Sequence, residues 1–232
     1  MKLFRIAAIA GVCLLGLLLA IVIGKRGGTE TEPEAVEVVN VEEVRTQAES
    51  GEAAAQYKLG GLLTKGQEVE QDYAEAAQWH RKAAEQGHAA AQRSLAELYE
   101  AGQGVPLDPA EAARWFRHAA EQGDVVAQYS LAVLHVMGKG VARDIPEAVK
   151  WYRRAAEQGD SLAQFNLGVR HSEGDGVAQD PVEAYKWFSL AAAQGVEDAV
   201  RARDSLTSKM TREQIVEGRR RTEAFTPRKP GA

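Results

Sequence analysis

The chain has 232 residues, of which 45% are hydrophobic, 26% charged and 6% aromatic, and its net charge is −5. This length suffices for one or two domains, and few aromatics with frequent Ala, Glu and Gln favour helices over a β-sandwich. The acidic balance argues against a nucleic-acid-binding protein, and a single cysteine excludes a disulfide framework and a cysteine-based zinc site.

The N-terminal part of the sequence predicts a membrane anchor followed by an acidic linker. Residues 6–23 carry no charge and would form a helix of about 27 Å, close to the thickness of a bilayer core. The stretch is long for a cleaved signal peptide, which is the alternative interpretation. We therefore expect a cytoplasmic tail at 1–5, a transmembrane signal anchor at 6–24 and a flexible linker at 25–39.

The charges beside the predicted anchor give its orientation. Lys2, Arg5 and the amino terminus precede the apolar stretch, and Lys25 and Arg26 follow it. This slight bias favours a cytoplasmic N-terminus. We expect a single-pass protein of the inner (plasma) membrane, with its remaining domain on the periplasmic side.

A period of 36 residues runs through the rest of the chain. Its four tryptophans are spaced by this period, and a series of glutamines, a series of aspartates and a series of glycines keep the same spacing. Four units in register predict an all-α fold, a solenoid of helix-turn-helix repeats at 52–87, 88–123, 124–159 and 160–195. The tryptophans are predicted to form the structural core of the repeats: Trp79, Trp115, Trp151 and Trp187.

Two helices are predicted in each unit. In the second unit, Asp108 is expected to cap the second helix, Glu111 to complete a capping box with it, and Gly123 to end the helix in the left-handed conformation. The first helix is predicted from an apolar stripe with helical spacing: Ala91, Leu95, Leu98 and Tyr99.

Shorter segments with the same register lie at both ends of the repeats. Residues 40–51 align with the end of a unit and are expected to form a leading half-repeat. Residues 196–225 are expected to form C-terminal capping helices, the last of them capped by Thr211, and 226–232 a disordered tail. Such terminal units cover apolar faces that a solenoid would otherwise expose.

The repeat pattern A-Q-x-x-L-(G/A)…G-x-G-V…D…A-x-x-W-(F/Y)…A-A-x-Q-G resembles the SLR (Sel-one-like repeat) branch of the tetratricopeptide superfamily. The resemblance covers about 53–206. It implies a right-handed α-solenoid whose concave face binds peptides or protein segments. Three residues depart from the pattern: Glu68 replaces a glycine, His80 an aromatic residue and Arg170 a leucine. Some secreted relatives have a disulfide in each repeat, and their reported β-lactam binding transfers poorly to a chain without one.

No catalytic motif stands out in the sequence. We find no H-E-x-x-H, G-x-S-x-G, S-x-x-K or Walker A pattern. His135 and His171, one unit apart, are expected to pack between helices rather than to bind a metal. We therefore predict a non-enzymatic protein without cofactor or metal. The alternative is a cell-envelope enzyme or ligand binder of the β-lactam or peptidoglycan-processing kind.

The resemblance places a partner-binding groove on the first helices of the units. It is expected to bind an unidentified protein or peptide, as a monomeric, membrane-anchored scaffold or adaptor. Tyr57, Tyr129 and Phe165 recur almost in register, so packing between helices is an alternative role for them. The candidate groove residues are charged or mixed in the first two units and apolar in the last two: Tyr57, Arg93, Glu97, Tyr129, Val133, Met137, Phe165 and Val169.

Overall fold

The computed structural model describes residues 40–228, and this part of the chain contains eleven α-helices and no strand. The predicted cytoplasmic tail, anchor and linker at 1–39 lie outside it. None of the described helices combines the length and the apolar character needed to cross a membrane.

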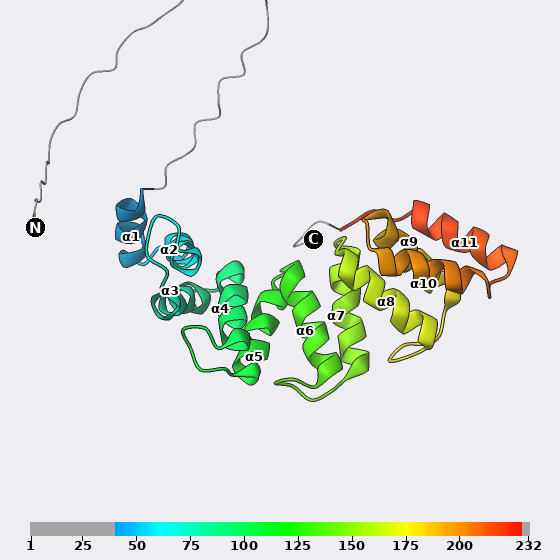
Figure 1. Ribbon diagram of the computed structural model, residues 1–232, viewed down its shortest axis with the longest axis horizontal. Helices are drawn as coiled ribbons and strands as arrows, with labels where there is room; N and C mark the ends of the chain where they lie inside the picture. The colour runs from blue at the N-terminus through cyan, green and yellow to red at the C-terminus, as the bar shows by residue number, and fades with distance from the viewer. Residues whose placement is uncertain (1–39, 229–232) are drawn as a thin grey trace, which may run out of the picture. The chain divides into compact units, whose positions relative to one another are not determined.

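The first ten helices of the described part follow one another in chain order, each packed on its neighbours, and the last helix packs back on the ninth (Figure 1). This arrangement confirms the predicted solenoid of four helix pairs. A short leading helix, α1 (Val41–Glu49), precedes the pairs. The first helices of the pairs are α2 (Ala53–Lys65), α4 (Ala89–Ala101), α6 (Val125–Met137) and α8 (Ser161–Glu173), and the second helices are α3 (Tyr73–Glu85), α5 (Pro109–Glu121), α7 (Ile145–Glu157) and α9 (Pro181–Ala193).

The second helices begin at the predicted aspartates, but the capping box is only half formed. The Asp108 carboxylate accepts hydrogen bonds from the backbone N–H groups of Ala110 and Glu111. The Glu111 carboxylate does not return to the cap and instead pairs with Arg114 at 2.7 Å. The predicted reciprocal box is therefore wrong for these helices, because a nearby cation offers the glutamate a charged partner.

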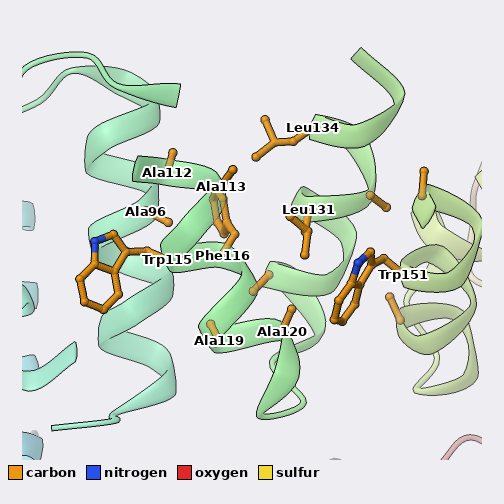
Figure 2. Packing of buried hydrophobic residues seen from close by; sticks show 14 of the residues in the cluster. Ala96, Ala112, Ala113, Trp115, Phe116, Ala119, Ala120, Leu131, Leu134 and Trp151 are labelled. Atoms are coloured by element: carbon orange, nitrogen blue, oxygen red, sulfur yellow. The ribbon is translucent and has the colours of Figure 1, made fainter. Parts of the chain in front are cut away.

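Small residues let the helices approach one another, and large side chains fill the remaining space. The four tryptophans are at most 8% exposed. In Figure 2, Trp115 and Phe116 of α5 and Leu131 of α6 lie between helices, with Ala96 and Ala112 where the backbones come close. This alternation buries apolar surface between the helices, which is the main source of stability in a repeat protein.

Pairs of glutamines tie each unit to the preceding one. Gln128 is 3% exposed, and its Nε2 donates to the carbonyl oxygen of Ala120, the residue eight positions earlier, at 3.1 Å. Its Oε1 accepts a hydrogen bond from Nε2 of Gln158 at 2.8 Å. The same arrangement recurs at Gln56, Gln92 and Gln164, so the buried amide of each unit has both its nitrogen and its oxygen hydrogen-bonded.

Two further helices close the C-terminal end: α10 (Glu197–Thr207) and α11 (Arg212–Glu223). Thr211 caps α11 as predicted, here in a reciprocal box with Gln214. Helix α11 packs on α9, where Gly218 faces the ring of Tyr185. Residues 226–228, which we expected in a disordered tail, are instead held: the backbone N–H of Arg228 donates to the carbonyl oxygen of Glu157 at 2.7 Å.

Candidate partner-binding surfaces

All eight candidate groove residues lie on the first helices, and none of them is buried. Met137 is 66% exposed, Glu97 is also exposed, and the other six are half-buried. The first helices of successive units therefore share a surface on which these side chains are accessible.

Three of the candidates also pack within their own unit. The ring of Tyr57 lies 5.7 Å from that of His80, and the ring of Tyr129 lies 5.8 Å from that of Tyr152. Phe165 faces a second-helix phenylalanine at 5.9 Å in the same way. The alternative role in packing between helices thus applies to these aromatic residues, which still leave part of each ring accessible.

A hollow of about 630 Å³ lies between α2 and α4. Tyr57, Arg93 and Glu97 all line it, so the structure brings together the candidates of the first two units. Lys58 and Lys65 add positive charge to its wall. The hollow is large enough for a few side chains of a bound segment.

Arg93 is the best-held charged group of this hollow. It donates to Glu97 at 2.9 Å and to Asp124, the cap of α6, at 3.2 Å. Partial burial opposes its charge, but the hydrogen bond that it donates to Glu97 and the charges of the Glu97 and Asp124 carboxylates outweigh this and raise the pKa of Arg93. Arg93 is therefore a fixed cation that links two units.

The apolar candidates occupy the next two first helices. Val169 lines a second hollow, of about 520 Å³, between α8 and α10; Tyr129, Val133, Met137 and Phe165 line neither hollow. Sequence reasoning missed two exposed members of this surface, Val126 and Leu162, each 48% exposed. Both precede a candidate aromatic residue by three positions, the spacing of one helix face, which is the signal that identifies them.

The histidines of the repeats pack between helices. His135 and His171 are 6% and 5% exposed, and Nε2 of each lies 3.3 Å from an arginine, Arg117 and Arg153 respectively. Burial, with a contribution from Arg153, lowers the pKa of His171. Among residues 40–228, no group of three or more His, Cys, Asp or Glu side chains is placed to hold a metal ion.

The C-terminal segment carries the second group of residues that sequence reasoning missed. The ring of Phe225 packs edge-on against Trp187, with centroids 5.6 Å apart. Arg228 pairs with the Glu157 carboxylate at 2.9 Å. The signal available in the sequence was Phe225 itself, an aromatic residue in an otherwise polar C-terminal segment.

These features define an α-solenoid repeat protein with an accessible surface on its first helices. The chain belongs to the Sel1 repeat family, because the Sel1 repeat model matches residues 53–88, 89–124, 125–160 and 161–196. The predicted SLR resemblance is thereby confirmed, with unit boundaries one residue later than expected. Sel1 repeat proteins are typically non-catalytic scaffolds for protein–protein interaction.

Solved structures of two bacterial proteins are similar to this chain. One is a protective antigen of uropathogenic Escherichia coli with an SLR fold, which is 39% identical with a TM-score of 0.72 over 80% of this chain and 41% of the antigen. The other is a Sel1 repeat protein from Oxalobacter formigenes, 30% identical, with a TM-score of 0.66 over 79% of this chain and 77% of that protein. This chain thus spans less than half of the first relative. No curated protein matches the sequence.

Proposed function

We propose that this chain is a non-catalytic scaffold that binds an extended segment of a partner protein across the first helices α2, α4, α6 and α8. The observation that carries the proposal is the hollow between α2 and α4, where Tyr57, Arg93 and Glu97 converge. A fixed cation beside an accessible aromatic ring suits a segment with both charged and apolar side chains.

The apolar side chains of the next two units extend this surface. Val126 and Met137 of α6 and Leu162 of α8 are each at least 48% exposed. Exposed apolar side chains grouped on neighbouring helices indicate a surface that a partner covers. The partner segment would place its charged residues over α2 and α4 and its apolar residues over α6 and α8.

We further propose that residues 6–24 anchor this scaffold in the inner membrane as a single pass, with the repeats on the periplasmic side. The charge-free stretch and the positive charges before it support this proposal. A partner of the cell envelope would then meet the repeats while they are tethered.

Photo-crosslinking in cells tests the binding surface. A photoreactive residue at Val126 or Glu97 of the full-length chain should give a discrete crosslinked protein, whereas one at Ala74 or Ala110, exposed at the start of second helices, should not. The double substitution Val126→Glu with Leu162→Glu should abolish the product, because two charges in the apolar surface resist burial.

A matched variant controls for added charge. Gln78→Glu with His118→Glu also adds two negative charges, but on exposed positions of second helices, and should leave the crosslink intact. Products that arise from Ala74 and Ala110 but not from Val126 and Glu97 would contradict the proposed surface.

A further inference from the structure

The C-terminal segment lies on an edge of the solenoid that the first helices do not form. After α11 the chain runs back past α9 toward α7 (Figure 1). Phe225 packs on Trp187 of α9, and Arg228 binds the end of α7 through a backbone hydrogen bond and an ion pair, both with Glu157. Between them Pro227 lies over Gly159, whose missing Cβ would be 3.7 Å from the proline ring.

The groups that hold this segment belong to the repeat itself. They are a tryptophan of one second helix, with a glutamate at the end of the preceding second helix and the glycine two positions after it. We call each such set an edge site. The site under the C-terminal segment is Trp187, Glu157 and Gly159. Three equivalent sets precede it: Trp151, Glu121 and Gly123; Trp115, Glu85 and Gly87; and Trp79, Glu49 and Gly51, in which the glutamate ends the leading helix α1.

The glutamates of the three earlier edge sites are open. Glu49, Glu85 and Glu121 are exposed, and none of them has an ion-pair partner within residues 40–228, whereas the Glu157 side chain under Arg228 is 26% exposed. Nothing lies within 4 Å of the position that a Cβ on Gly51 or Gly87 would take. The acceptors that Arg228 uses at α7 are therefore available at the ends of α1, α3 and α5.

The tryptophans of the open sites also keep a cation on their rings. Lys186 lies 4.1 Å from the Trp187 ring and 5.7 Å from that of Phe225, so the bound aromatic side chain sits beside a cation. Arg154 lies 4.5 Å from Trp151, Arg114 lies 4.6 Å from Trp115, and Lys82 lies 3.9 Å from Trp79. These three rings are 4–8% exposed, so an aromatic side chain arriving at an earlier site would pack on the ring once the flexible cation moves aside.

We propose that the edge sites form a second interaction surface, which binds an extended partner segment with an aromatic residue and, three positions later, an arginine. The aromatic ring packs on the tryptophan, and the arginine pairs with the glutamate. A backbone N–H of the segment satisfies a carbonyl at the helix end, where the last carbonyls lack helical partners and the helix dipole is negative. The segment Phe225–Arg228 occupies one site in this way and defines the chemistry that the other three accept.

A peptide copy of the bound segment tests this surface. The probe is a fluorescent peptide with the sequence of residues 222–228, blocked at both ends and titrated into the full-length chain in detergent solution. We expect saturable binding, which Glu49→Lys with Glu85→Lys and Glu121→Lys should weaken about fivefold or more, since charge reversal removes the partner of the arginine at all three open sites. Replacing the phenylalanine of the peptide by alanine should weaken binding to a similar extent.

The control separates this surface from the one on the first helices. Glu97→Lys with Glu173→Lys and Glu197→Lys makes the same change in net charge on exposed positions of α4, α8 and α10, and should leave the affinity within about twofold of the unmodified chain, well below the effect of losing a direct ion pair. Circular dichroism establishes that both variants keep their helices. The proposal is overturned by a lack of saturable binding, by equal binding to the two triple variants, or by indifference to the phenylalanine of the peptide.

Discussion

His80 fills the space between the two helices of the first unit, where the other units have Phe116, Tyr152 and Phe188. Its ring lies against Gly60, and the ring of Phe188 lies against Gly168 in the same way. Burial, with smaller contributions from His88 and Arg93, lowers the pKa of His80 to about 4. The fold therefore holds this histidine in its neutral form.

His80 should make the stability of the repeats sensitive to acid. An unfolded histidine binds a proton below about pH 6.5, while the folded one resists until about pH 4. The contribution of neutral His80 to the free energy of unfolding is thus complete above pH 6.5 and is lost as the pH falls toward 4. The loss is about 2.5 kcal/mol at pH 4.5. His80→Phe should remove this part of the difference between urea unfolding at pH 7.5 and at pH 4.5.

Because the pKa of His171 is also lowered, the stability of the His80→Phe variant will keep a residual pH dependence in the same direction. Phenylalanine fits position 80 because the fourth unit already places one over a glycine. If His80→Phe and the unmodified chain lose the same free energy of unfolding between the two pH values, His80 is not held neutral.

At the scale of the helical elements, the turns between the two helices of a unit set how closely units stack. Gly140 has φ 73°, and a Cβ there would lie 2.0 Å from the carbonyl oxygen of Pro109 at the start of α5. Gly104 and Gly176 occupy equivalent positions. In the first unit this position holds Glu68, at φ 61°. The helix that precedes this unit is the leading helix α1, which begins at Val41, four residues later than the equivalent second helix would begin.

Gly140→Ala should therefore destabilise the repeats by about 2 kcal/mol or more, because it adds a clash with backbone to a strained left-handed conformation. Gly61→Ala is the matched change. Gly61 lies within α2 with nothing within 4 Å of its Cβ position, so alanine should stabilise the helix by about 0.5–1 kcal/mol. Thermal unfolding of both variants gives the comparison, and a neutral Gly140→Ala would mean that the turn moves freely.

The elements were predictable from sequence because their signals are local and repeated. Asp108 marks the start of a helix, Gly102 the end of one, and the tryptophan a buried face. Residues of the same type recur at these positions in every unit. The capping boxes failed because the glutamates find cations such as Arg114, a choice that depends on rotamers rather than on spacing. The position of Phe225 failed for another reason: its partner Trp187 lies 38 residues earlier, and no repeat places the two together.

The candidate surface was partly predictable for the same reasons. The register put Arg93 and Glu97 on an accessible helix face, and the structure adds the contact with Asp124 that fixes the arginine. The aromatic candidates have a mixed role, since Tyr129 and Tyr152 contact one another within a unit. Periodicity identifies a face of a helix, but the share of a ring that neighbouring side chains cover follows from packing.

At the scale of the whole molecule, our proposal joins the repeats to a membrane through residues 6–24. Deleting residues 1–26 should move the protein from the membrane pellet to the soluble fraction, because the charge-free stretch is the part of the sequence long enough to span a bilayer. The helices of the repeats should keep the same circular dichroism signal and the same unfolding midpoint.

The full-length protein provides the control for that fractionation. It should remain in the pellet after extraction at high pH or high salt, which removes proteins held by charge alone. A deleted chain that still sediments with membranes would place the attachment elsewhere, and the arginine-rich helix α11 would then be the first segment to replace.

The glutamine pairs give the repeat array a rule for changing its length. Each buried glutamine reaches a carbonyl eight residues before it and a second glutamine thirty residues after it. A gain or loss of 36 residues, wherever it is cut, brings an identical set of partners into place. A change of any other size within the helices would separate at least one pair and leave a buried amide without a hydrogen bond. Duplication and deletion of whole units are thus the alterations in gene length that this architecture tolerates best.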